Sequence, residues 1–260
     1  MEEYTPEHRA RLQKAFGYTY EQYRTSIRNM ALNGAESIGA MGVDTPLAVF
    51  SKQNRPLFDY FKQLFAQVTN PPIDAIREEI VTSTSVYVGK DGNNPILTNT
   101  DMMKIKSFKH EGFKTAVVST LYYKSTKLER AIDRLFVEVD KAFREGANIL
   151  VLSDRGVDEN HMPIPSLLAV SAVHQHLVKT KKSTSLAIIL ESGEPREVHH
   201  FATLLGYGAS AINPYLALET IHELIDSHML DKDYYAAVDD YNHAVISGIV
   251  KIASKMGIST

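Results

Sequence analysis

Four polar residues stand at the ends of three apolar runs that the sequence predicts to be β-strands. Asp154 and Arg155 follow one run, Glu191 follows the next, and Asn213 ends a third. In open α/β sheets, ligands usually bind beyond the carboxyl ends of parallel strands. The four side chains could therefore surround a small polar or anionic ligand. A structural role is nevertheless favoured, since residues at such junctions often cap helices and fix loops through hydrogen bonds and ion pairs.

The elements that must position these residues form a regular β–α succession. Strands are predicted at 114–120, 148–152, 185–190 and 210–213, and helices at 128–145, 166–179, 194–205, 217–228 and 233–254. Strands that are apolar on both faces, each followed by an amphipathic helix, indicate a mostly parallel sheet. Four such steps are too few for a closed eight-stranded barrel. The predicted fold class is therefore α/β, with an open, mostly parallel, Rossmann-like sheet and an N-terminal helical region.

The part before this succession reads as an N-terminal helical region. Helices are expected at 5–35, 57–68 and 72–80, and a hairpin or excursion at 82–100. The predicted organisation is an N-terminal helical and loop part at 1–112, a βα-repeat part at 113–253, and the start of another domain at 254–260.

The sequence contains no motif for a metal, phosphate or dinucleotide site. Its ten histidines lack chelating spacing, and the HELID segment at His222 lacks the second histidine of a zinc-protease motif. No phosphate-binding loop or dinucleotide fingerprint is present, and Gly206-Tyr207-Gly208 reads as a helix end followed by a tight turn. We therefore expect no metal site in this chain.

Composition narrows the function classes further. The chain has 260 residues, 44% of them hydrophobic and 23% charged, with a net charge of −3 and no cysteine. No basic block favours nucleic acid, and no apolar run approaches the roughly 20 residues that span a bilayer. Without cysteine the chain cannot supply disulfides, thiolate catalysis or iron–sulfur ligands. The acidic, polar N-terminus does not resemble a secretory signal, and a cytoplasmic location is expected.

Two segments are unusual for a self-sufficient domain. The stretch 61–79 interrupts an apolar helical pattern with Val-Thr-Asn-Pro-Pro and then restarts as a helix. Pro71 biases Asn70 towards extended backbone, and Pro72 suits the first turn of a helix, so the segment is a stiff elbow. The predicted final helix runs into Ser-Lys-Met-Gly-Ile-Ser-Thr at 254–260, which reads like the beginning of a further element.

Several ordered blocks resemble the central region of the large subunit of glutamate synthase. They are 41–51 (MGVDTPLAVFS), 61–79 (FKQLFAQVTNPPIDAIREE), 146–157 (GANILVLSDRGV), 165–177 (PSLLAVSAVHQHL), 191–221 (ESGEPREVHHFATLLGYGASAINPYLALETI) and 254–260 (SKMGIST). The blocks are spread over nearly the whole chain. The segments around 82–94 and 122–127 depart from the family pattern, and both are expected to be surface loops.

The resemblance implies a part of a larger enzyme. Glutamate synthases form glutamate from glutamine and 2-oxoglutarate, passing ammonia through a tunnel from an amidotransferase domain to a barrel domain that carries FMN and a 3Fe–4S cluster. The central domain connects the two and, in this family, resembles an incomplete version of the barrel, built from barrel-like βα units. The implied partners are those two domains and, as a further candidate, a small reductase subunit, with no nucleic acid and no membrane. The chain would hold neither cofactor and no catalytic residue, and would be inactive alone. It would be a piece of a longer polypeptide or a natural subunit of a split enzyme.

The resemblance also assigns roles to single residues. It places Thr69, Asn70 and Ser259 in the tunnel wall, and Lys255 near the 2-oxoglutarate and FMN site. The alternative is a free-standing α/β enzyme or ligand-binding domain that uses the strand-end residues on a small anionic metabolite.

Overall fold

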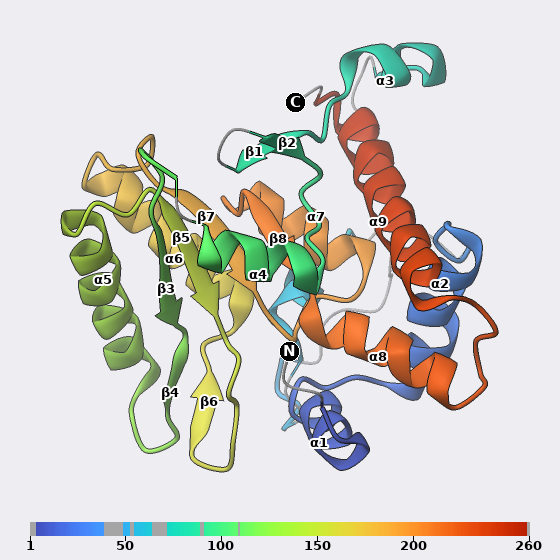
Figure 1. Cartoon of the computed structure of the whole chain (residues 1–260), viewed down its shortest axis with the longest axis horizontal. Coiled ribbons are helices and arrows are strands. Elements are labelled where there is room, and N and C mark those ends of the chain that lie inside the picture. Colours follow the sequence, from blue (N-terminus) through green and yellow to red (C-terminus); the bar gives the residue numbers. More distant parts are fainter. Residues whose placement is uncertain are drawn as a thin grey trace. The chain divides into compact units, whose positions relative to one another are not determined.

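The computed structural model describes residues 4–38, 49–52, 55–63, 72–88, 91–108 and 110–258 (Figure 1). The chain forms two compact units. We call Met1–Phe16, Ser85–Pro195 and Leu204–Thr220 the sheet unit. We call Gly17–Thr84, Arg196–Thr203 and Ile221–Thr260 the helical unit. Each unit therefore combines segments that are far apart in sequence.

The sheet unit is built on four parallel strands. They are β3 (Thr115–Ser119), β5 (Ile149–Ser153), β7 (Ala187–Glu191) and β8 (Ala211–Asn213), in the order β3-β5-β7-β8. In register, Ser119 pairs with Ser153, Ser153 with Glu191, and Glu191 with Asn213. The carboxyl ends of all four strands are therefore level. The open, mostly parallel α/β sheet expected from the sequence is confirmed.

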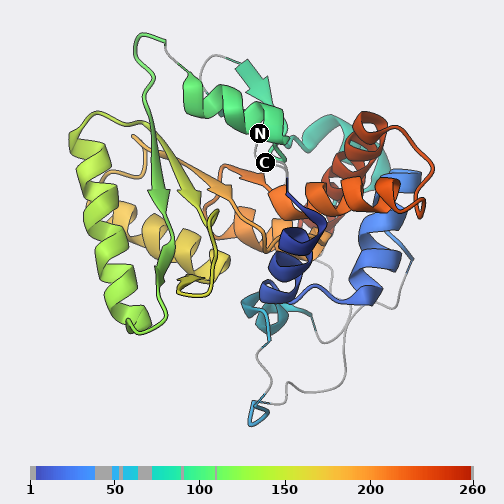
Figure 2. The same ribbon diagram turned by 60° about the horizontal axis from the view of Figure 1, so that its bottom comes forward.

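The helices that follow the strands also match the βα succession. They are α5 (Leu128–Arg144), α6 (Ser166–Lys179), α7 (Val198–Gly206) and α8 (Tyr215–Asp226). The expected apolar stripe of α5 is buried at Leu135 and Val139, each 0% exposed. Figure 1 and Figure 2 show α5 beside β3. Helices α7 and α8 each contribute residues to both units.

A helix that the sequence reading did not assign covers part of the sheet. Helix α4 (Asn99–Ser107) begins with a capping box in which Thr98 and Asp101 satisfy each other's backbone N–H groups. Its Met102 packs with Leu97 against residues of β5, β7 and β8. The hairpin expected before it is present as β1 (Val86–Val88) and β2 (Asp91–Asn93). A second antiparallel pair joins β4 (Leu121–Tyr123) to β6 (His161–Pro163).

The single helix expected at 5–35 is two helices. Helix α1 (Pro6–Ala15) ends before Gly17, whose φ of +67° suits glycine, and the chain then re-forms a helix from a π-helical turn, η1 (Gln22–Ile27), and α2 (Arg28–Asn33). Because Gly17 takes a left-handed conformation, the helical path is broken there.

The rest of the helical unit is organised by α9 (Tyr234–Met256), which packs along α2. The helix expected at 57–68 is described only as the 3₁₀ turn η2 (Leu57–Phe61), and 64–68 lie outside the described residues. Helix α3 (Ala75–Val81) is capped by Asp74. Among the described residues, no helix has both the length and the apolar character needed to cross a bilayer.

Candidate functional site

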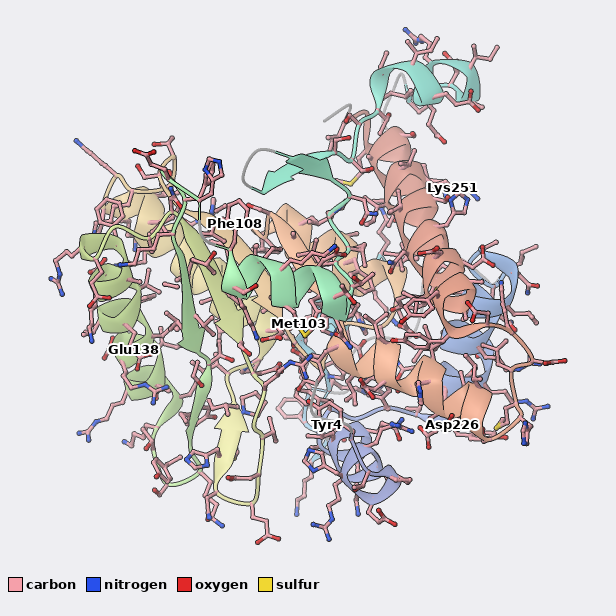
Figure 3. The ribbon with its side chains drawn as sticks, in the orientation of Figure 1. Tyr4, Met103, Phe108, Glu138, Asp226 and Lys251 are labelled. Atoms are coloured by element: carbon pink, nitrogen blue, oxygen red, sulfur yellow. The ribbon has the colours of Figure 1, made fainter. Side chains whose placement is uncertain are left out.

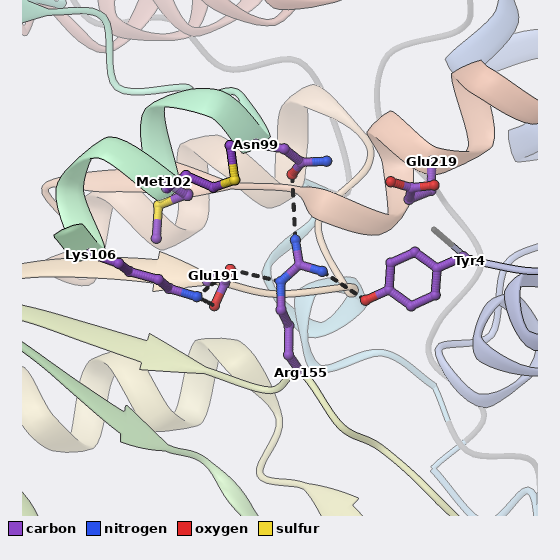
Figure 4. A pocket seen from close by; sticks show the side chains of 8 residues that line it. Tyr4, Asn99, Met102, Lys106, Arg155, Glu191 and Glu219 are labelled. Carbon is purple, nitrogen blue, oxygen red and sulfur yellow. Dashed lines mark hydrogen bonds and ion pairs between the residues drawn. The ribbon is translucent and has the colours of Figure 1, made fainter. Parts of the chain in front are cut away.

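A cavity of about 170 Å³ lies in the sheet unit and is lined by side chains from the carboxyl ends of β5 and β7 (Figure 4). Its lining residues are Tyr4, Asn99, Met102, Met103, Lys106, Arg155, Glu191 and Glu219. Tyr4, close to the N-terminus, and Met103, on α4, are marked in Figure 3. The level strand ends and the segment of α4 thus bring together residues separated by more than 200 positions.

Glu191 is the centre of the cluster. Its carboxylate is 1% exposed and accepts hydrogen bonds from Lys106 Nζ at 2.7 and 2.8 Å, Arg155 Nε at 2.7 Å and Ser153 Oγ at 2.6 Å. Burial alone would raise the pKa of Glu191, but Lys106, Ser153 and Arg155 outweigh burial and hold that pKa below its ordinary value. Glu191 is therefore an ionised acceptor, not a proton donor.

Arg155 links the cluster to the N-terminal segment. Its Nη1 donates to the Tyr4 hydroxyl at 2.7 Å and its Nη2 to Asn99 Oδ1 at 3.5 Å. The guanidinium carbon lies 4.2 Å from the centre of the Tyr215 ring, within the range of a cation–π contact. Arg155 is thus held on three sides while 30% of its side chain stays exposed.

Asp154 does not line the cavity and is buried. Its carboxylate accepts hydrogen bonds from Ser192 Oγ at 2.5 Å and Gly193 N at 3.1 Å, and it is also hydrogen-bonded to the Tyr215 side chain. Burial raises the pKa of Asp154 to about 7, even though these three hydrogen bonds lower it. Asp154 therefore fixes the loop after β7.

Asn213 does not line the cavity either. Its side chain is 0% exposed, and its amide donates to Leu97 O at 2.9 Å and to Asn99 Oδ1 at 3.1 Å. The Asn213 Oδ1 atom has no hydrogen-bond partner among the described residues. Asn213 thus orients Asn99, which in turn contacts Arg155.

The structure places the four strand-end candidates in two groups. Arg155 and Glu191 line the cavity, whereas Asp154 and Asn213 support it from inside. Sequence reasoning missed Lys106, which comes from the unassigned helix α4. The Thr98–Asp101 capping box was the sequence signal that could have revealed this helix.

The charged side chains of the cavity are already engaged in ion pairs. Lys106 and Arg155 both pair with Glu191, and Glu219 lies 3.9 Å from Arg9. An anionic ligand would have to compete with the Glu191 carboxylate for both cations. The cavity is also smaller than the roughly 300 Å³ at which small-molecule pockets begin, so it cannot enclose a flavin. Among the described residues, no group of three His, Asp or Glu side chains is placed to hold a metal ion.

Of the family-derived residues, only Lys255 is described. It lies in the last turn of α9, which ends at Gly257 in the left-handed conformation. Thr69, Asn70 and Ser259 lie outside the described residues. The chain directly after the Pro71-Pro72 elbow is described, and there Ile73 N donates a hydrogen bond to Ser254 O at 3.1 Å.

Comparisons with known proteins agree on one family. A family model described as the glutamate synthase central domain matches residues 11–260. The glutamate synthase [NADPH] large chain of Bacillus subtilis is 47% identical over 263 residues, which cover 95% of this chain and 17% of that protein. The glutamate synthase [NADH] of Schizosaccharomyces pombe is 42% identical, covering 95% of this chain and 13% of that protein.

Ferredoxin-dependent glutamate synthase 2 of Synechocystis is 41% identical, covering 95% of this chain and 18% of that protein. The chain therefore spans less than a fifth of the length of these relatives. Because the family model covers nearly all of the sequence, this chain belongs to the glutamate synthase central domain family.

Proposed function

We propose that this chain is the connecting domain of a glutamate synthase large chain, that it forms part of the wall of the ammonia tunnel, and that it is inactive alone. The observation that carries the proposal is the hydrogen bond from Ile73 N to Ser254 O, 3.1 Å long. It joins the chain that leaves the Pro71-Pro72 elbow to the helix end that bears Lys255. These are the two segments to which the resemblance assigns the tunnel wall, and they are about 180 positions apart in sequence.

The chemistry of this place suits a small neutral molecule. Ammonia needs small polar groups along its path and no strong charge to trap it. The Ser254 side chain is 4% exposed, and its hydroxyl has no hydrogen-bond partner among the described residues. A buried hydroxyl without a partner is costly, so a small polar molecule passing here would satisfy it. Thr69, Asn70 and Ser259 would add further groups of this kind.

The inactivity of the isolated chain follows from what it lacks. It has no cysteine to serve as the amidotransferase nucleophile or to ligate an iron–sulfur cluster. The strand-end cavity is too small for FMN, and the carboxylate at its centre, Glu191, has a pKa held below its ordinary value. FMN and the 3Fe–4S cluster would therefore be held by other domains. Lys255 would approach FMN and 2-oxoglutarate only in the assembled enzyme, where an ammonium suits a dicarboxylate.

A second candidate is a free-standing domain that binds a small anionic metabolite at the strand ends. The observation in its favour is that Lys106 and Arg155 line one cavity. A thermal melt separates the two proposals. A ligand at a hundred times its dissociation constant should stabilise the chain by about 2.7 kcal/mol. We expect no such shift with 2-oxoglutarate, glutamine or FMN, and a saturable shift with one of them would favour the second candidate.

The tunnel role is testable in a hybrid large chain, in which residues 1–260 replace the matching region of the Bacillus subtilis relative. Thr69→Trp and Ser259→Trp should lower glutamine-dependent glutamate formation at least tenfold. At saturating ammonia, glutamate formation should stay within twofold, because free ammonia reaches the flavin site without the tunnel.

The control is Ser185→Trp, at an exposed position before β7, which should leave both activities unchanged. The tunnel role would be refuted if both tryptophan variants lowered the two activities equally, or lowered neither.

A further inference from the structure

The strand-end cavity is balanced in charge, which limits what it can bind. Its lining includes two cations, Lys106 and Arg155, and two carboxylates, Glu191 and Glu219. A bound anion would leave one negative charge uncompensated there, and a bound cation would leave one positive charge. Because an uncompensated charge is costly to bury, the cavity favours a ligand whose net charge is zero.

One side chain of the cavity has a hydrogen-bond donor without an acceptor. Asn99 is 7% exposed, and its Oδ1 accepts hydrogen bonds from Arg155 Nη2 at 3.5 Å and from Asn213 Nδ2 at 3.1 Å. Its amide nitrogen, Nδ2, donates to no acceptor within the part of the chain that the structure describes. Figure 4 shows the oxygen of Asn99 directed at Arg155 and the nitrogen directed to the side. An oxygen of a bound ligand would satisfy this buried donor.

The two cations beside Asn99 keep donors for a ligand as well. Lys106 Nζ has three N–H groups, and its hydrogen bonds to described residues go to Glu191 alone. The Nη1 and Nη2 atoms of Arg155 carry two N–H groups each, and each atom has one described partner. The side chains of Lys106 and Arg155 stay 32% and 30% exposed. A ligand carboxylate could therefore share both cations with Glu191.

The other end of the cavity offers an acceptor. In the view of Figure 4, Lys106 lies at one end of the row of side chains and Glu219 at the other, with Arg155 between them. The Glu219 side chain is 16% exposed, and Arg9 Nη2 lies 3.9 Å from its carboxylate, at the limit for an ion pair. A ligand ammonium could donate a charged hydrogen bond to this carboxylate. Donors at one end and a carboxylate at the other match the two poles of an α-amino acid.

The size of the cavity and its apolar wall restrict the side chain of such a ligand. The cavity holds about 170 Å³, so the ligand must be small. Met102, which is 2% exposed, and Met103, which is 46% exposed, supply the apolar part of the lining. A methyl group packs well against methionine. A longer side chain with a polar end would bury that end against methionine without a hydrogen-bond partner.

We propose that the strand-end cavity binds a small α-amino acid with a short apolar side chain, of the size of alanine. Its carboxylate would accept hydrogen bonds from Asn99 Nδ2, Lys106 and Arg155, and its ammonium would donate to Glu219. The ligand differs in charge from the anionic metabolite of the second candidate. The inference does not depend on the proposed function, because a connecting domain can bind an amino acid without converting it.

Isothermal titration calorimetry of the 260-residue chain tests the proposal with three matched probes. L-alanine has both poles, propionate lacks the ammonium and ethylamine lacks the carboxylate. We expect L-alanine to bind saturably, with one site per chain. Propionate and ethylamine should each bind at least about tenfold more weakly, because each loses the charged hydrogen bonds of one pole. L-glutamine should show no saturable binding, because its carboxamide would face the methionines.

Two variants place the ligand in the cavity. Glu219→Gln should weaken the binding of L-alanine at least about tenfold and leave the affinity for propionate unchanged, since only the ammonium contacts Glu219. Met103→Trp should fill the cavity and abolish binding while every charged side chain stays in place. The matched controls are Glu138→Gln, at an exposed carboxylate of α5, and Met162→Trp, at an exposed methionine of β6. Both controls should keep the affinity for L-alanine.

The melting temperature of each variant shows that it is folded before its affinity is compared. Equal affinities for propionate and L-alanine would overturn the proposal in favour of an anion site, and equal affinities for ethylamine and L-alanine would overturn it in favour of a cation site. A folded chain that binds no L-alanine, or a loss of affinity in the two controls as large as in Glu219→Gln and Met103→Trp, would also overturn it. The cluster would then be an ion-pair network with a structural role only.

Discussion

Replacing Glu191 by glutamine should destabilise the chain strongly, because it removes the single negative charge that two cations share. The carboxylate is 1% exposed and lies 2.7 Å from both Lys106 Nζ and Arg155 Nε. Glutamine keeps the shape of the side chain. Its amide oxygen can accept a hydrogen bond from one cation, but its NH₂ group then faces the other donors around the carboxylate, to which it cannot hydrogen-bond.

The magnitude follows from burial and from the exposure of the partners. Removing one member of a buried ion pair typically costs about 3–5 kcal/mol. Here Lys106 and Arg155 remain 32% and 30% exposed, so water can partly replace the lost partner. We therefore expect Glu191→Gln to lower the free energy of unfolding by about 2–3 kcal/mol at pH 7.

Urea denaturation of the 260-residue chain measures this change. The control is Glu138→Gln, which removes an exposed ion pair with Arg134 and should change the free energy of unfolding by less than about 0.5 kcal/mol. The folded-state pKa of Glu191 lies below its ordinary value of 4.5, so the stabilisation is present above pH 4.5 and is lost as pH falls through the folded-state pKa. A loss below about 0.5 kcal/mol at pH 7, or a difference that does not shrink in acid, would refute this reasoning.

Three further changes have defined outcomes. The folded-state pKa of Asp154 is about 7, above its ordinary value of 3.8, so between these pH values the folded chain binds a proton that the unfolded chain does not, and it loses stability as pH rises from 4 to 7. Asp154→Asn should reduce that loss of stability by at least about 1 kcal/mol, measured by urea titrations at pH 5 and pH 8. An unchanged pH dependence of stability would contradict this prediction. Gly208→Ala should destabilise the folded chain by about 2 kcal/mol, because the φ angle of Gly208 is +115° and a Cβ atom there would lie 2.5 Å from the His174 ring. The control is Gly206→Ala, where the added Cβ meets open space and should cost little. Similar melting temperatures of the two variants would contradict the prediction. Leu135→Ala, at a fully buried position of α5, should cost about 2–5 kcal/mol by urea denaturation, and a loss under 1 kcal/mol would show that α5 packs loosely.

The elements that were predicted well are those with strong periodicity. Helix α6 begins and ends where the sequence placed it, at 166–179, and β5 is shifted by one residue. The helix expected at 5–35 was wrong as one element, because glycine at position 17 takes a left-handed conformation and the apolar pattern on either side does not reveal the break. Helix α4 was missed because its nine residues contain too few apolar positions to establish a helical period.

The candidate site could be anticipated only in part. Level strand ends bring Arg155 and Glu191 together, which follows from the rule for parallel sheets. Whether a strand-end side chain faces the cavity or the interior depends on loop geometry, and this separates Arg155 from its neighbour Asp154. Lys106 and Tyr4 reach the cavity from distant segments, and no local pattern marks such a long-range contact.

The most direct test of the central claim is an assay of the 260-residue chain alone. The purified chain would be incubated with ammonia, 2-oxoglutarate, FMN and a chemical reductant, and glutamate would be quantified. A connecting domain without a complete active site predicts no glutamate above a protein-free control. Glutamate formation that is proportional to the chain concentration and is lost in Lys255→Met would contradict the account.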